Sequence, residues 1–96
     1  MPKKFDIKSL STKELERISN TLNQLKRLYP NDLGIQKLNS TSEIDKAIRF
    51  IHTDDFVNLG ARYGRQSLEG MMQMYINKEQ YEICAQIRDA IKEKGL

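Results

Sequence analysis

Apolar residues recur at intervals of three and four along most of the chain, which is the spacing of an amphipathic helix. The clearest stripe contains four residues: Leu15, Ile18, Leu22 and Leu25. Ser11 stands before this stripe and Glu14 follows three residues later, a capping-box pattern typical of a helix start. Pro30 ends the stripe, because the residue before a proline is pushed out of the helical region. These signals predict a helix over residues 12–28.

Two further stripes predict helices over 43–52 and 55–63, the second capped by Asp54. The segment between the first two helices, PNDLGIQKLNSTS, is rich in turn-forming residues. We expect its three large apolar residues to fold back onto the core: Leu33, Ile35 and Leu38.

The apolar register breaks between Tyr63 and Leu68, in a stretch that also contains Gly60, Gly64 and Gly70. Each glycine disfavours a helix interior by about 1 kcal/mol relative to alanine. Residues 54–76 therefore form either two helices that meet near Gly64 or one bent helix.

A last helix is predicted over 79–94, with Gly95 as its stop signal. No segment shows the sustained alternation of a strand. The predicted fold is all-α, a small helical bundle of four to five helices that ends in an antiparallel helical hairpin. We expect an N-terminal helical region over residues 1–66 and the hairpin over residues 67–96, packed together as a single domain.

The composition narrows the class of protein further. Cys84 is the only cysteine among 96 residues, which excludes an intramolecular disulfide and a Cys-based zinc site. No apolar run approaches the roughly 20 residues that a membrane-spanning helix needs. The first ten residues have no apolar segment of the kind found in a signal peptide. The expected location is therefore the cytoplasm, with no membrane association.

The net charge of +3 lies in the first half of the chain. Residues 1–48 carry nine Lys and Arg against six Asp and Glu, whereas residues 49–96 carry seven of each. Five basic residues are candidates for contacts with a nucleic-acid backbone: Lys3, Lys4, Lys8, Arg62 and Arg65. Tyr63 between the two arginines adds a ring on which a base can stack. The alternative is a core-facing Tyr63 with arginines that are solvated or pair with Asp54, Asp55 or Glu69, and we favour that alternative.

His52, Asp54 and Asp55 form the one cluster with metal-ligating side chains in the sequence. They lie at a helix boundary, where aspartate is favoured as a cap, and no further ligand stands nearby. With one histidine and one cysteine, the chain has almost no residues that could form a catalytic pair of nucleophile and base. The sequence therefore predicts a protein without enzymatic activity, metal or cofactor.

The segment Leu68–Lys94 combines two helical stretches with a short polar turn, NKEQ, between them. A leucine–glutamate pair and a methionine precede the turn. An aromatic–glutamate pair, two small residues and a large apolar residue with arginine–aspartate follow it. These places hold Leu68-Glu69, Met72, Tyr81-Glu82, Cys84-Ala85, Ile87-Arg88-Asp89 and Ile91. In order and spacing the segment resembles the UVR motif of the excision-repair proteins UvrB and UvrC and of the regulator McsA.

The resemblance implies a protein–protein docking element that pairs with a similar hairpin and has no catalytic residues. Flexible methionines suit such a surface, because they adapt to a partner. Six residues are expected to contact the partner: Leu68, Met71, Met72, Tyr75, Tyr81 and Arg88. The predicted function is that of a small adaptor or regulator that binds another protein or a second copy of itself. A helix pair that only completes the chain's own core explains the same pattern, and a small basic nucleic-acid-binding protein is the alternative function.

Overall fold

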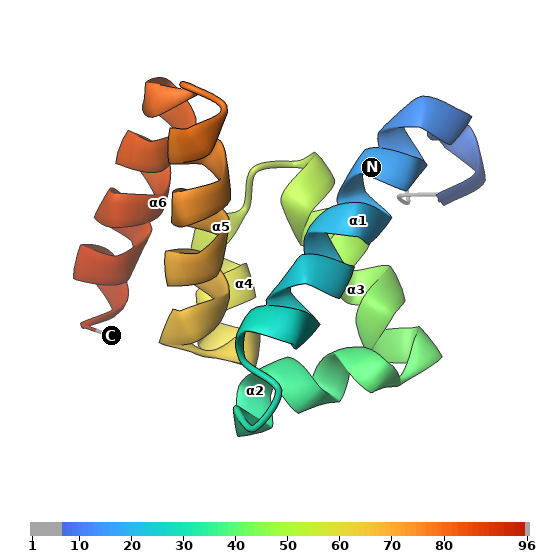
Figure 1. Cartoon of the computed structure of the whole chain (residues 1–96), viewed down its shortest axis with the longest axis horizontal. Helices are drawn as coiled ribbons and strands as arrows, with labels where there is room; N and C mark the ends of the chain where they lie inside the picture. Colours follow the sequence, from blue (N-terminus) through green and yellow to red (C-terminus); the bar gives the residue numbers. More distant parts are fainter. Residues whose placement is uncertain (1–6, 96) are drawn as a thin grey trace, which may run out of the picture.

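The computed structural model describes residues 7–95, and they contain six α-helices, two short 3-10 helices and no strand (Figure 1). The α-helices are α1 (Thr12–Leu28), α2 (Leu33–Gln36), α3 (Thr41–His52), α4 (Phe56–Tyr63), α5 (Arg65–Asn77) and α6 (Tyr81–Lys94). The 3-10 helices are η1 (Ile7–Ser9) and η2 (Lys37–Asn39). The all-α prediction is confirmed.

Helix α1 begins and ends where the sequence predicts. The Ser11 hydroxyl accepts a hydrogen bond from the Glu14 amide N–H at 3.1 Å, so the first half of the capping box is present. The Glu14 carboxylate turns to Arg17, whose guanidinium donates to it at 2.8 Å. The apolar stripe of α1 is buried at Ile18, Leu22 and Leu25.

The connector after α1 contains α2 and η2, which the sequence analysis did not predict. Asp32 caps α2 by accepting a hydrogen bond from the Ile35 amide at 2.9 Å. Ile35 and Leu38 are buried as expected, but the prediction for Leu33 is wrong, because its side chain is 80% exposed. Leu33 lies two residues from Ile35, which places it on the opposite side of a helical turn.

Residues 54–76 form two helices rather than one bent helix. Gly64 separates α4 from α5 with φ +93° and ψ 168°, a conformation that is essentially restricted to glycine. A Cβ atom at this position would meet no other atom within 4 Å. Backbone conformation, and not space, therefore requires glycine here.

The start of α4 differs from the expected capping. Asp55, and not Asp54, accepts the hydrogen bond from the Asn58 amide, at 3.3 Å. Asp54 instead takes a left-handed backbone conformation, φ +55°, in the turn between α3 and α4. Aspartate is among the few residues that tolerate this conformation.

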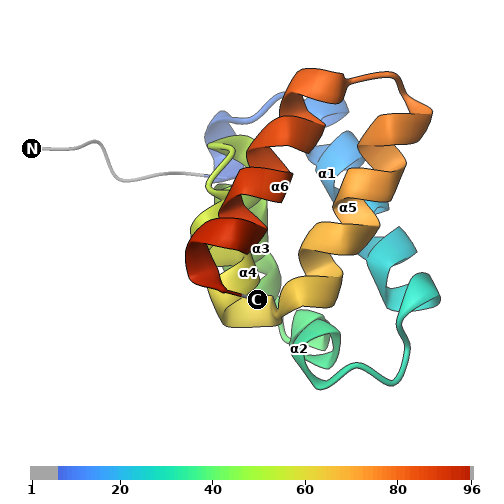
Figure 2. The same cartoon turned by 90° about the vertical axis from the view of Figure 1, so that its left-hand side faces the viewer.

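Helices α5 and α6 lie side by side and antiparallel, joined by the turn at residues 78–80 (Figures 1 and 2). Helix α4 packs against both of them, and α1 packs against α5. One buried core draws residues from all six α-helices. The hairpin is therefore packed into the fold along one side, and only its other side and its end face solvent.

Glycine permits two of the close approaches that hold these helices together. A Cβ atom on Gly34 of α2 would overlap the carbonyl oxygen of Tyr63 at the end of α4. A Cβ atom on Gly70 of α5 would lie 2.6 Å from a methyl carbon of Leu25 in α1. Gly70, which in an isolated helix only weakens it, here lets α1 approach the hairpin.

Candidate docking surface

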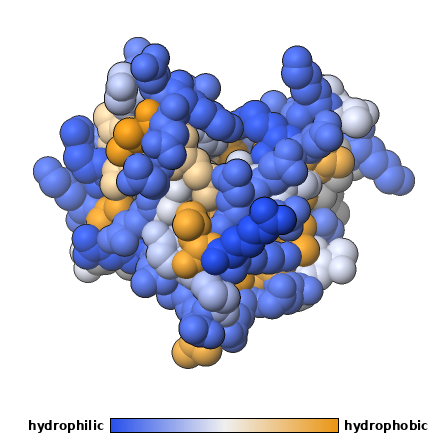
Figure 3. Space-filling model, viewed as in Figure 1, coloured by the Kyte–Doolittle hydropathy of each residue, from blue (hydrophilic) through white to orange (hydrophobic). Residues whose placement is uncertain are grey.

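Exposed apolar and aromatic side chains lie on the hairpin and on the neighbouring α1. The exposed fractions are 40% for Ile76 and 63% for Tyr81, and Leu28 of the neighbouring α1 is 55% exposed. Figure 3 shows apolar patches over the hairpin and between α5 and α1, each surrounded by hydrophilic surface. Exposed apolar patches of this kind mark candidate interaction sites.

A groove lies between α1 and α5, with a volume of about 310 Å³. It is lined by six residues, which are Gln24, Arg27, Leu28, Gln73, Met74 and Asn77. Leu28 and Met74 supply its apolar surface, and amide side chains surround them. Arg27 is its only ionised lining residue, and no ion pair within residues 7–95 neutralises it. We call this feature the α1–α5 groove.

The turn of the hairpin forms a second hollow, lined by Glu79, Gln80, Tyr81, Glu82 and Ile83. We call these five residues the hairpin tip. The Tyr81 ring does not fill the space beside the turn, because most of the side chain faces solvent. Within residues 7–95 neither Glu79 nor Glu82 makes an ion pair. The tip therefore presents an aromatic ring beside two unpaired carboxylates.

The six residues predicted to contact a partner divide into two groups. Leu68, Met71 and Tyr75 are buried inside the chain and offer almost no surface to another molecule. Met72 is half-buried, whereas Tyr81 and Arg88 are exposed. The interpretation that the hairpin completes its own core therefore holds for one side of the hairpin. The part that α1 plays in this surface was not predicted, because a helical stripe does not reveal which side chains border a groove between two helices.

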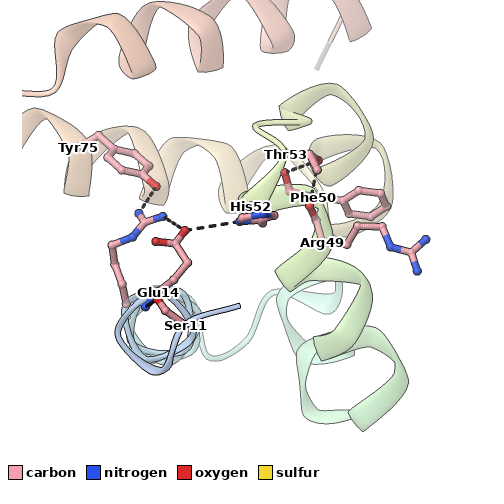
Figure 4. A network of polar contacts seen from close by, with 8 residues as sticks. Ser11, Glu14, Arg49, Phe50, His52, Thr53 and Tyr75 are labelled. Atoms are coloured by element: carbon pink, nitrogen blue, oxygen red, sulfur yellow. Dashed lines mark hydrogen bonds and ion pairs between the residues drawn. The ribbon is translucent and has the colours of Figure 1, made fainter. Parts of the chain in front are cut away.

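A polar network ties the other side of α5 to α1 and α3 (Figure 4). The Arg17 guanidinium donates to the Tyr75 hydroxyl at 3.3 Å and to the Glu14 carboxylate at 2.8 Å. The His52 imidazole lies 3.6 Å from the same carboxylate. The Arg17 hydrogen bond lowers the pKa of Glu14, and His52 contributes to the same shift. The Tyr75 side chain is thus buried in the core, and its hydroxyl accepts a hydrogen bond from Arg17.

Arg62 and Arg65 both pair with carboxylates of their own chain. Arg62 donates two hydrogen bonds to Glu43, at 2.7 and 2.6 Å, and Arg65 pairs with Glu69 one helical turn on. The buried Tyr63 hydroxyl donates to the Glu43 carbonyl and carboxylate at 2.8 and 2.9 Å. The Arg62 hydrogen bonds lower the pKa of Glu43 to about 2 and raise the pKa of Arg62, while burial raises the pKa of Tyr63.

The other three basic residues, which were candidates for contacts with nucleic acid, add little to that hypothesis. Lys8 is exposed in η1. Lys3 and Lys4 lie outside the described residues. The core-facing Tyr63 and the Arg65–Glu69 pair match the favoured alternative for this stretch, whereas Arg62 pairs with Glu43, which was not among the predicted partners.

Among residues 7–95 there is no group of three side chains placed to hold a metal ion. Nor does this part of the chain contain a helix that is long and apolar enough to cross a membrane. Comparisons with protein-family models, with curated proteins and with solved structures found no match for this chain. The class of protein that the fold defines is therefore a small all-α protein with one exposed hairpin end.

Proposed function

We propose that this chain is a non-enzymatic adaptor or regulatory protein that docks onto a protein partner through the exposed end of its α5–α6 hairpin. The observation that carries the proposal is the exposure of Ile76 and Tyr81 on the hairpin, together with the α1–α5 groove that Leu28 and Met74 line. Tyrosine is among the residues that most often dominate the binding energy at interfaces.

Two further features support a docking function. Met74 lines the α1–α5 groove, and a thioether side chain on three rotatable bonds adapts to the shape of a partner. The resemblance of residues 68–94 to the UVR motif supports docking by the hairpin as well. Contacts to nucleic acid rank second, since Arg62 and Arg65 already bind Glu43 and Glu69.

The direct test places a photo-cross-linking amino acid at position 81 or 28, and at position 33 as the matched control. Leu33 is equally apolar and more exposed, but it lies on α2. The proposal predicts one protein product that forms from positions 81 and 28 and not from position 33. The purified product must then bind the wild-type chain and lose affinity for the Met74→Glu variant. Equal cross-linking from all three positions, or binding that ignores Met74→Glu, contradicts the proposal.

A further inference from the structure

We infer that the occupant of the α1–α5 groove is the hairpin tip of a second copy of this chain. This inference rests on the proposed function and names the partner for the same surface. It follows from three properties of the groove and the tip, which are their charges, their relative position and the backbone of Glu79.

The charges of the two surfaces are opposite. The α1–α5 groove carries the cation of Arg27, and the hairpin tip carries the carboxylates of Glu79 and Glu82, none of which makes an ion pair within residues 7–95. Lys78, the cation of the turn, lines neither hollow. Opposite potentials across a contact favour the correct partner and the correct orientation. An arginine beside apolar side chains also suits a tyrosine ring, which it can approach face-on.

The α1–α5 groove and the hairpin tip adjoin where α5 ends. Asn77 closes the groove and Glu79, two residues later, opens the tip. A contact about a two-fold axis uses the same patch on both subunits, so each molecule must present both the projecting part and its receptor side by side. Each tip would then enter the partner copy's groove, and Tyr81 would bury its ring against Leu28 and Met74.

The backbone conformation of Glu79 in the tip is consistent with this contact. Glu79 has φ +59°, a left-handed conformation that glycine adopts without steric cost. A residue other than glycine is destabilising there by roughly 1 kcal/mol, so folding alone favours glycine. The proposed contact gives this glutamate a use that folding alone does not.

Sedimentation velocity over a wide concentration range tests the inference. One variant reverses the tip charges (Glu79→Lys with Glu82→Lys), a second carries Arg27→Glu, and a third combines all three changes. All these side chains are exposed. Their circular dichroism is expected to match the wild type, which verifies folding. The matched control is Asp89→Lys with Glu93→Lys, two exposed carboxylates farther along α6.

We expect a reversible wild-type dimer. The tip reversal and Arg27→Glu are each expected to weaken it about tenfold or more, and the combined variant to recover most of that loss. Tyr81→Ala is expected to weaken it by about thirtyfold, as for a central aromatic anchor. The control pair and Leu33→Ala leave it unchanged.

Two results would overturn the inference. The first is a wild-type chain that stays monomeric at every concentration. The second is a dimer that responds equally to the control pair and to the tip reversal. In either case the cross-linking experiment still decides the proposed function, because a different protein captured from positions 81 and 28 would sustain docking without self-association.

Discussion

The two sides of the α5–α6 hairpin differ in what covers them. Leu68, Met71 and Tyr75 are buried in the core, on a helix that packs against α1, α4 and α6, whereas Tyr81 and Ile76 are exposed near the turn. Both sets are apolar or aromatic and lie within 14 residues of one another in sequence. An apolar helical pattern therefore shows that one face of a helix is favoured to leave water. Whether that face is buried by the same chain or stays exposed depends on how the neighbouring helices pack.

The difference between the buried and the exposed side of the hairpin is tested most strongly by truncating one side chain on each. Leu68→Ala removes a fully buried side chain. It should lower the free energy of unfolding by about 3 kcal/mol, through lost burial and a cavity. Ile76→Ala, on the same helix but 40% exposed, is the matched control and should change it by less than about 1 kcal/mol. Urea denaturation measures both, and equal losses would show that the hairpin is not divided in this way.

A smaller effect is expected where two helices touch through glycine. Gly34→Ala places a methyl group against the backbone carbonyl of Tyr63, which cannot rotate away. We expect a loss of about 2 kcal/mol in the free energy of unfolding. Gly95→Ala, which faces open space but has φ +64°, is the control and should lose only about 1 kcal/mol. A neutral Gly34→Ala would mean that α2 does not lie against the end of α4.

Acid should destabilise the protein by protonating the Glu43 carboxylate, which accepts hydrogen bonds from Arg62 and Tyr63. Folding lowers the pKa of Glu43 from 4.5 to about 2. The ionised group is therefore favoured in the folded state, and its contribution is present above pH 4.5 and lost as the pH falls toward 2. Denaturation at pH 5 and pH 2.5 should show a smaller loss for Glu43→Gln than for wild type. The lowered pKa of Glu14 acts in the same range, so Glu14→Gln is the comparison variant. Identical losses in wild type and Glu43→Gln would contradict the assignment.

The smallest expected effect on stability belongs to the tip. Tyr81→Ala should change the free energy of unfolding by no more than about 0.5 kcal/mol, because most of its surface already faces water. The same change should weaken docking about thirtyfold. A large loss of stability in Tyr81→Ala, measured by the same urea titration, would show that Tyr81 is buried in the core. It could then not be the central contact of the proposed docking surface.

Local signals in the sequence predicted much of the fold. The Ser11 cap, the stripe of α1 and the stop at Gly95 act within a few residues, so they could be recognised directly. The break at Gly64 was visible as a change of register, although only the structure shows that it separates two helices. Helix α2 was missed because one turn is too short to display a period.

The docking surface was harder to predict, for a physical reason. The apolar pattern of α5 identified Leu68, Met71 and Tyr75, which turned out to serve the core. The α1–α5 groove combines Leu28 and Met74, residues 46 positions apart that meet only after the chain has folded. A lone exposed leucine at the end of a helix carries no signal of its own in the sequence.

An NMR dilution series tests the central claim most directly, because it reports every amide of the unmodified chain at once. Raising the concentration of the wild-type protein should shift amide signals in two places, residues 24–28 of α1 and residues 73–83 around the tip. Signals of α2 and of the buried Leu68 and Met71 should stay constant, apart from the general broadening of a larger particle. Spectra that do not change with concentration, or shifts centred on Lys37 and Arg62 instead, would contradict a docking surface formed by the groove and tip of two copies.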